Sequence, residues 1–365
     1  MKSLILKAPV NPLSFGNVSY NLIRELFRKD INVSLFPIGQ GLDFSVFDKA
    51  DPELKKWAED CATNRFLSLK KETPTLQMWH LNGSENRISR SQFLYTFYEL
   101  DSPTLTEKNL VDIQDEVIFS SSNAASKFKL VGCENVSSCP LGFDEDFHET
   151  GKEYMKDKIH FTLIGKFEKR KHTQRILEWW VEKYGNNYDY QLSCCIINPF
   201  YQPDQMNQAI AQSLKGVKYG NVNFLPFLKT NSEVNELMNS SDIDLSGLSG
   251  AEGWNLPSFN STCLGKWSIV LNSSSHKDWA TKENCILVEP DGTEEVYDNI
   301  FFNRGAPFNQ GNISNFSKEK FHNSIEKAIS KCKSRNEAGA KLREVFTYSN
   351  TVDKILSTIE KKSDK

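Results

Sequence analysis

The sequence predicts an α/β protein with two Rossmann-like domains that face each other across a cleft. Three observations lead to this fold class. A chain of 365 residues exceeds one ordinary hydrophobic core and suggests two domains. Strand-like and helix-like segments alternate in both halves, which is typical of parallel sheets covered on both faces. A polar stretch at 144–158 separates the halves and is expected to be a linker.

The composition favours a globular protein outside the membrane. Hydrophobic residues make up 39% and charged residues 25%, and no apolar run approaches the roughly 20 residues that span a bilayer. The N-terminal apolar run is broken by Lys7 and two prolines, so it predicts a buried strand and no signal peptide. The eight cysteines form no CxxC pair, which favours reduced thiols and a cytoplasmic location. A net charge of −3 argues against a surface that attracts nucleic acid as a whole.

The first half is expected to alternate strands and helices in order. Val18, Leu22 and Leu26 repeat at helical spacing and predict an apolar helix face, with Asn17 as the N-cap. A second helix is expected over 52–69. The expected strands are 3–6, 32–37, 76–80, 93–98, 116–119 and 136–139.

The second half repeats the same pattern after the linker. Helices are expected at 174–184, 205–214 and 233–238, and strands at 159–164, 190–196, 222–225, 243–245 and 267–271. Apolar residues at helical spacing near the C-terminus, from Val352 to Ile359, predict a last amphipathic helix. The predicted domains are 1–150 and 151–345, with the helix in 346–365 packing back on the first. Ligands of such sheets bind at the carboxyl ends of the strands, so the cleft is the expected site.

One group of residues with a chemical signature lies between Ser249 and Ser274. Glu252, Gly253 and Trp254 precede Asn255 and Leu256, which lead into a helix. Glycine allows the backbone to come close to a ligand, and the N–H groups of a helix N-terminus form an anion site. An ordinary turn between strand and helix is the alternative interpretation.

A second group follows the strand at 159–164. Gly165 ends that strand, and Lys166, Lys169, Arg170 and Lys171 crowd the loop that follows. Cations at the carboxyl end of a strand suit a diphosphate, because arginine contacts phosphate through two N–H groups and lysine through a point charge. A solvated run of charges is the alternative.

Together the two motifs resemble a known family. Gly-Lys-Phe-Glu-Lys-Arg-Lys at 165–171 and Glu-Gly-Trp-Asn-Leu-Pro at 252–257 look like the C-terminal half of the large retaining glycosyltransferase family of the two-Rossmann (GT-B) fold. That family includes glycogen-synthase-like and sucrose-synthase-like enzymes. The resemblance extends over segments 95–102, 117–132, 137–147, 222–247 and 346–356, whereas 43–72 and 291–311 do not follow the pattern.

The resemblance implies an activity. It implies transfer of a hexose from a nucleotide diphosphate sugar, with UDP-glucose as the expected donor, to a hydroxyl group of a glycan or other molecule. The donor's sugar configuration would be retained, because the departing phosphate would help to deprotonate the acceptor on the same face. No carboxylate cluster stands at a strand end, so we expect no metal and no cofactor besides the donor substrate.

The resemblance also implies roles for individual residues. Arg170 and Lys171, with help from Lys166, would neutralise the donor diphosphate. Glu252 would hold sugar hydroxyls, and the backbone from Gly253 through Trp254 and Asn255 to Leu256 would hold the phosphate and sugar. Phe227 and Leu228 would flank the base, and Gly16 would belong to a flexible loop beside the acceptor.

The sequence departs from the family pattern at two positions, one expected to bind the donor and one expected to act in catalysis. The family's second glutamate, which grips the ribose, is replaced by Asn260, which lacks the charge that strengthens such bonds. The catalytic histidine of many relatives has no match, since Tyr98 and Glu99 occupy that stretch. Glu99 and His80 are therefore the remaining candidates on the acceptor side. A structural role for His80 is the alternative.

Two rival functions remain open at this stage. One is a nucleotide-sugar or glycan binding protein of the same shape with little turnover. The other is a transferase whose acceptor is a modified base in DNA, for which Lys70, Lys71, Arg87 and Arg90 would form the basic surface. The expected partners are thus a nucleotide-sugar donor and a hydroxyl acceptor, with nucleic acid only as acceptor, no membrane span, and a homodimer left open.

Overall fold

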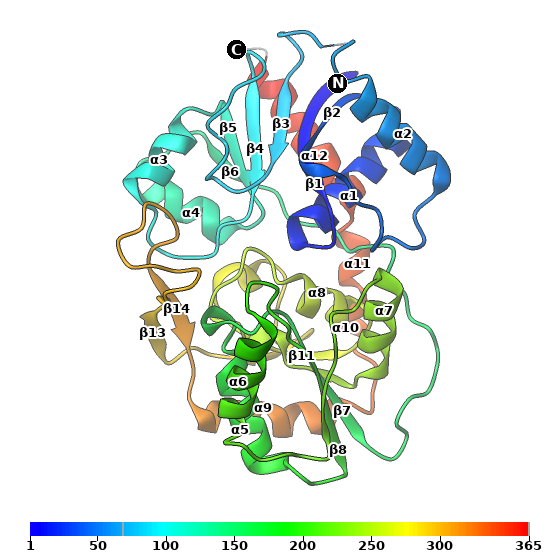
Figure 1. Ribbon diagram of the computed structural model, residues 1–365, viewed down its shortest axis with the longest axis vertical. Helices are drawn as coiled ribbons and strands as arrows, with labels where there is room; N and C mark the ends of the chain where they lie inside the picture. The colour runs from blue at the N-terminus through cyan, green and yellow to red at the C-terminus, as the bar shows by residue number, and fades with distance from the viewer. Residues whose placement is uncertain (68, 364–365) are drawn as a thin grey trace. The chain divides into compact units, whose positions relative to one another are not determined.

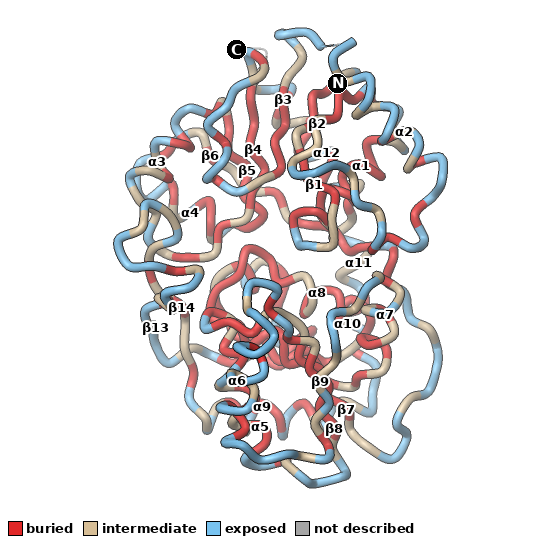
Figure 2. The backbone as a smooth tube through the Cα atoms, in the orientation of Figure 1, coloured by how far each residue is buried: buried red, intermediate tan, exposed pale blue. Residues whose placement is uncertain are grey.

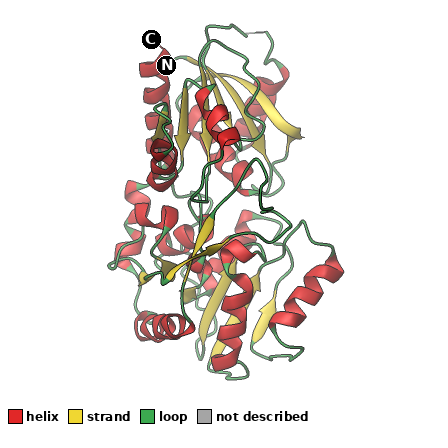
Figure 3. Cartoon of the chain, turned by 90° about the vertical axis from the view of Figure 1, so that its left-hand side faces the viewer, coloured by secondary structure: helices red, strands yellow, loops and turns green. Residues whose placement is uncertain are grey.

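The computed structural model describes residues 1–67 and 69–363. The chain forms two compact units, residues 1–146 with 305–310 and 344–365, and residues 147–304 with 311–343. Within the described residues each unit contains a six-stranded, all-parallel sheet. Helices lie on both faces of each sheet (Figures 1 and 3). This confirms the predicted α/β class with two Rossmann-like domains.

The sheet of the first unit runs in the order β2-β1-β3-β4-β5-β6. The chain therefore turns to opposite sides after β1 and after β3, and such a reversal opens a ligand crevice at the carboxyl ends of the two strands. The strands are β1 (Ser3–Val10), β2 (Asn32–Leu42), β3 (Thr75–Met78), β4 (Gln92–Thr96), β5 (Glu116–Phe119) and β6 (Val136–Ser138). The helices are α1 (Ser14–Arg28), α2 (Pro52–Thr63), α3 (Leu105–Asp112), α4 (Ser122–Leu130) and α12 (Tyr348–Ser363).

The structure corrects three local predictions for this unit. Asn17 does not cap α1, because the helix begins one turn earlier with Leu13 at the cap, and the Asn17 amide donates to the carbonyl of Pro12. The stretch from position 144 is not purely a solvated linker. Asp144 and Asp146 are buried and pair with Arg24 of α1 at 3.4 and 3.0 Å. The expected helix over 52–69 ends at Thr63, and its position 68 lies outside the described residues, as do 364 and 365 of the predicted C-terminal segment.

The sheet of the second unit runs in the order β12-β11-β10-β7-β8-β9, the order of a dinucleotide-binding Rossmann sheet. Its reversal point lies between β7 and β10. The strands are β7 (Ile159–Ile164), β8 (Tyr190–Cys195), β9 (Val222–Phe224), β10 (Ile243–Asp244), β11 (Trp267–Leu271) and β12 (Ile286–Val288). The helices are α5 (Thr173–Tyr184), α6 (Pro203–Ser213), α7 (Asn231–Ser240), α8 (Leu256–Cys263), α9 (Lys318–Lys331), α10 (Glu337–Ala340) and α11 (Leu342–Val345).

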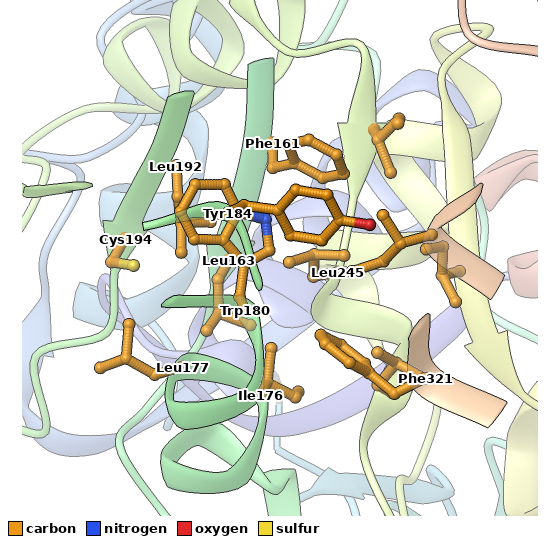
Figure 4. Close-up of a cluster of buried hydrophobic side chains, with 14 of the residues drawn as sticks. Phe161, Leu163, Ile176, Leu177, Trp180, Tyr184, Leu192, Cys194, Leu245 and Phe321 are labelled. Atoms are coloured by element: carbon orange, nitrogen blue, oxygen red, sulfur yellow. The ribbon is translucent and has the colours of Figure 1, made fainter. Parts of the chain in front are cut away.

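The core of the second unit fixes β7 against the helices beside it. Phe161 on β7 meets Trp180 of α5 edge to face, with ring centroids 5.8 Å apart, and both side chains are fully buried (Figure 4). The sheet strands are mostly buried along the chain, whereas exposed positions concentrate on loops and outer helix faces (Figure 2). The carboxyl ends of β7 and β10 are thus held by a packed core, which positions the loops that follow them.

A two-stranded antiparallel hairpin, β13 (Gly292–Glu295) and β14 (Asn312–Asn315), has no counterpart among the predicted elements. It is formed by the segment 291–311, which departs from the family pattern, together with the residues that follow it. In the described part of the chain, no helix is long and apolar enough to cross a membrane. The eight cysteines are free thiols.

Candidate active site

The basic loop after β7 begins at a glycine that the backbone requires. Gly165 has φ +149°, and a β-carbon there would lie 3.2 Å from the Lys171 side chain. The loop then closes in a tight turn at Lys169–Lys171. Within this turn Arg170 is buried, Lys171 is partly buried and Lys169 is exposed. The predicted cations are therefore in different environments, and only some of them form a solvated surface.

Glu252 lies directly against two of these cations. Its Oε2 is 3.1 Å from Nη1 of Arg170, and its Oε1 accepts from Nζ of Lys171. Burial raises the pKa of Glu252, but the charges of Lys171 and Arg170 outweigh burial and hold the pKa well below its usual range. The two sequence motifs thus meet in one ion cluster between the ends of β7 and β10, and Glu252 stays ionised there.

The turn that carries Glu252 is held by residues after β11. The Glu252 N–H donates to Oγ of Ser274 at 3.0 Å, and the same hydroxyl donates back to the Glu252 carbonyl at 2.8 Å. Asn255 adopts a left-handed conformation with φ +71° and caps α8. These bonds fix the backbone of the 252–255 turn independently of any ligand.

His276 positions Asn255. Its Nδ1 lies 2.8 Å from the carbonyl of Leu271, and its Nε2 lies 3.0 Å from Nδ2 of Asn255. Because an amide nitrogen only donates, Nε2 accepts and Nδ1 carries the proton. Burial lowers the pKa of His276 to about 4, so the ring is neutral at pH 7. Sequence reasoning missed this residue, although its position shortly after a predicted strand was a usable signal.

Asn260 and Trp254 lie inside the fold of the same motif. Asn260 is 4% exposed, and its Oδ1 has no hydrogen-bond partner among the described residues. Trp254 is buried against Phe259 of α8, with ring centroids 5.4 Å apart. Trp254 therefore anchors the turn through its ring. Asn260 keeps an acceptor oxygen that a ligand hydroxyl could satisfy, because buried polar atoms are rarely left unpaired.

The residues expected around the base follow β9 at the sheet edge. Phe227 is 46% exposed and Leu228 is partly buried. Their loop is joined to the end of β8 through the bond from the Leu225 N–H to the Cys194 carbonyl at 2.9 Å. Lys166 is partly buried in the loop after β7. The loops after β7, β8 and β9 are thus neighbours along one edge.

In the first unit, Gly16 and His80 lie at the carboxyl ends of β1 and β3, where the strand order reverses. Gly16 lies in the first turn of α1 and not in a flexible loop as expected, and a β-carbon there would lie 2.2 Å from the carbonyl oxygen of Asn11, so the helix packs too closely on that loop for any other residue. His80 is exposed, and its ring centroid is 4.2 Å from that of Phe15. Two further rings, those of Trp79 and Phe97, lie 5.6 and 4.4 Å from Phe15. Sequence reasoning did not foresee this aromatic cluster.

The stretch that replaces the family's histidine contains one structural and one accessible residue. Tyr98 is buried, and its hydroxyl donates to Glu107 at 3.0 Å. Burial first and then the charge of Glu107 raise the pKa of Tyr98, so it stays protonated. Glu99 is only partly buried. Of this pair, only Glu99 remains as a candidate to contact an acceptor.

Two further features bear on the rival functions. No group of three or more metal-binding side chains occurs within residues 1–67 and 69–363. The four basic residues suggested for a DNA acceptor precede β3 and β4, at the amino edge of the sheet, whereas His80 follows β3. Arg87 there pairs with Asp115 and donates to backbone carbonyls. The basic surface and the aromatic cluster therefore occupy opposite edges of the sheet.

No family model matches the chain, and no characterised protein sequence matches it. Solved structures do. HepE from Anabaena, in complex with UDP and glucose, is 14% identical with a TM-score of 0.66, over 99% of this chain and all of the other. Sucrose-phosphate synthase from Thermosynechococcus elongatus is 11% identical with a TM-score of 0.67 over 99% of both chains. TarM is 9% identical with a TM-score of 0.66 over 100% of this chain and 99% of TarM. These likenesses extend over the whole chain, and they show that it has the GT-B fold.

Proposed function

We propose that the protein is a retaining glycosyltransferase that takes a hexose from a nucleotide diphosphate sugar, with UDP-glucose as the first donor to test. The observation that carries this proposal is the ion cluster of Glu252, Arg170 and Lys171 between the ends of β7 and β10. It combines cations that can bind a diphosphate with a carboxylate that can accept hydrogen bonds from hydroxyl groups. It lies at the carboxyl ends of the strands, where Rossmann sheets bind ligands. The UDP bound to HepE, a protein of the same fold, supports uridine as the nucleoside of the donor.

The residues of the cluster would divide the work on the donor. The diphosphate would bind Lys171 and Lys166 of the loop after β7 and the N–H groups that precede α8, because lysine side chains and helix N-termini attract phosphate. Lys171 would then exchange Glu252 for phosphate, and the freed carboxylate would accept hydrogen bonds from sugar hydroxyls. Asn260 would accept one ribose hydroxyl through its buried Oδ1.

Catalysis would rest on stabilising the leaving group. The bond between the anomeric carbon and the phosphate oxygen breaks, and the electron pair stays on a UDP oxygen. Fixed cations and N–H groups lower the energy of that developing charge without any reorganisation. The departing phosphate oxygen would then take the proton from the acceptor hydroxyl, which attacks on the same face and so retains the configuration. No metal is required for these steps.

The acceptor would bind the aromatic cluster of Phe15, Trp79, His80 and Phe97 in the first unit. Aromatic faces suit the apolar faces of sugar rings, and the exposed His80 offers a hydrogen-bonding group beside them. A glycan hydroxyl is therefore the favoured acceptor. The DNA alternative loses support, because its basic residues lie at the other edge of the sheet.

Turnover with defined donors tests the proposal. The full-length protein would be incubated with UDP-glucose, UDP-galactose, UDP-N-acetylglucosamine and GDP-mannose, with and without a set of glycan acceptors, and the products identified by mass spectrometry. We expect transfer or slow donor hydrolysis with at least one UDP-sugar, and an α-linked product from an α-linked donor. Tight UDP binding without either reaction would favour the binding-protein alternative, and an inverted product would contradict retention.

A further inference from the structure

Residues 291–304, the part of the segment 291–311 that precedes Gly305, belong to the second unit and contact its basic loop. Nζ of Lys169 donates to the carbonyl of Tyr297 at 3.0 Å. Nearer the start of the hairpin, Glu294 pairs with Arg175 of α5 at 2.9 Å. The segment leaves the sheet after β12 at one edge, yet these contacts carry it to the loop after β7. Its position is therefore fixed beside the proposed donor site.

The tip of this segment is a rigid turn. Oδ1 of Asp298 accepts from the N–H groups of Ile300, Phe301 and Phe302, at 2.9, 2.9 and 3.0 Å. The side chain of Phe302 is only 4% exposed and anchors the turn in the core. The hydrogen bonds to Asp298 and the burial of Phe302 thus fix the backbone that carries the Phe301 ring.

Phe301 meets a second aromatic residue from another loop. The ring of Phe200, in the loop after β8, lies edge to face with that of Phe301, with centroids 5.0 Å apart. Nζ of Lys166 lies 5.1 Å from the centroid of Phe200 and 5.7 Å from that of Phe301. One of the predicted diphosphate cations is therefore in contact with both rings.

The loop that carries Phe200 is also fixed. Asn198 is 1% exposed, donates to the carbonyl of Phe167 in the basic loop at 3.0 Å, and accepts from the Phe200 N–H at 3.1 Å. Nevertheless Phe200 itself is 57% exposed. Phe200 thus presents an exposed ring, held by its own loop, next to the Lys166 cation in the loops that follow β7 and β8.

We propose that Phe200 stacks on the nucleobase of the donor, and that Phe301, supplied by the segment 291–311, holds Phe200 in position. This inference rests on the proposed function, because it assumes a nucleotide whose phosphates bind near Lys166. The loop after β8 lies between the basic loop after β7 and the loop of Phe227 and Leu228 after β9, because β8 lies between β7 and β9 in the sheet. Every nucleobase has a π-face, and an aromatic side chain stabilises it by stacking.

Calorimetry on the full-length protein tests this inference with three ligands: UDP, uridine and inorganic pyrophosphate. Phe200→Ala is expected to weaken UDP and uridine about 5- to 150-fold, the range for loss of one base–aromatic stack, and to leave pyrophosphate as in the wild type. Phe200→Tyr keeps a ring and should bind like the wild type. Phe301→Ala should weaken UDP and uridine by a smaller factor than Phe200→Ala, again without effect on pyrophosphate.

Tyr188→Ala is the matched control. Tyr188 is 59% exposed and has Nζ of Lys158 5.6 Å from its ring centroid, but it precedes β8 and so lies at the amino edge of the sheet. Its loss should leave all three affinities unchanged. Equal UDP affinity in the wild type and Phe200→Ala would overturn this inference alone, as would a pyrophosphate loss as large as the UDP loss. A wild type that binds no UDP, GDP or ADP would overturn the proposed function and this inference together.

Discussion

The environment of Glu252 in the structure differs from the one that the sequence predicted. The sequence predicted a carboxylate that binds sugar hydroxyls, whereas in the structure the carboxylate forms ion pairs with Arg170 and Lys171. In this arrangement the carboxylate pairs with the partly buried Lys171 and with the buried Arg170, which also pairs with Glu168 at 2.9 Å. A buried charge is costly without such partners, so these ion pairs offset the cost of burying Glu252.

Replacing the Glu252 carboxylate tests separately its contribution to stability and its contribution to turnover. Glu252→Gln should lower the melting temperature of the ligand-free protein, because breaking a buried pair costs up to about 3–5 kcal/mol. Saturating UDP should restore most of that loss, since phosphate replaces the missing charge. Turnover, measured well below the melting temperature, should fall more than about tenfold, or about 1.4 kcal/mol of transition-state stabilisation.

The control for this variant is Glu326→Gln. Glu326 pairs with Lys183 on the surface of the same unit and should change neither turnover nor UDP affinity. If Glu252→Gln lowered the melting temperature but kept the wild-type kcat, Glu252 would be structural only.

His276 predicts how stability depends on pH. The folded protein takes up a proton at this ring only near pH 4, because burial lowers its pKa, whereas the unfolded chain takes it up near 6.5. The unfolded state therefore binds more protons between these values, and the free energy of unfolding falls as pH decreases from about 6.5 to 4. By pH 5 this contributes roughly 2 kcal/mol of lost stability.

Urea unfolding at several pH values checks this expectation. Wild type and His276→Gln would be compared between pH 7 and 4.5, because other buried histidines contribute to both proteins equally. For the variant, the free energy of unfolding should change less steeply with pH, by about 1.4 kcal/mol per pH unit near pH 5, because one titrating group is missing. Identical slopes would show that His276 titrates alike in the folded and unfolded states.

At the scale of elements, the strands were the most predictable part. Ile159–Ile164, Trp267–Leu271 and Glu116–Phe119 are observed with the bounds that their apolar runs predicted. Fully buried parallel strands leave such runs in the sequence, because both faces pack against helices. The short helix α3 was missed despite a capping box in which Thr104 and Glu107 bond reciprocally, a signal that was present in the sequence.

The hairpin β13–β14 could not be predicted in the same way. Its strands are short and mostly polar, and 16 residues separate Glu295 from Asn312. Pairing over such a distance depends on what the segment packs against, here the basic loop and α5. The aromatic pair that it completes was therefore invisible in the sequence, as was the cluster around Phe15.

The start of α8 offers a test at the same scale. Asn255 combines a left-handed backbone with side-chain bonds to the Ser246 carbonyl and the Ser258 N–H. Asn255→Gly removes only the side chain, whereas Asn255→Ala adds the cost of that backbone conformation. Chemical denaturation should therefore find the alanine variant less stable than the glycine variant by about 1–2 kcal/mol. A glycine variant as unstable as the alanine variant would mean that the turn relaxes.

At the scale of the whole molecule, the fold class could be predicted because the alternation of elements recurs after position 158. The pairing of the two motifs could also be expected, since β7 and β10 meet at the reversal of strand order. The particular partners could not, because whether Lys171 contacts Glu252 or solvent depends on backbone details such as the φ of Gly165.

Turnover is expected to survive the removal of metal ions. The lysines and helix N–H groups that we propose to bind the diphosphate would stabilise its charge without a divalent ion. Turnover in excess EDTA should equal that in buffer alone. A fall to background that manganese or magnesium reverses would contradict this prediction.

We propose that the ion cluster of the second unit binds the donor diphosphate. The most direct test of this proposal is calorimetric titration of UDP and uridine into the full-length wild type and Lys171→Met, which removes one cation and keeps a side chain of similar length. We expect UDP to bind the wild type, and the variant to lose roughly 10- to 150-fold in UDP affinity, as for one charge-assisted contact, with uridine affinity unchanged. Equal loss for both ligands, or no loss for either, would show that Lys171 does not contact phosphate and would contradict the claim.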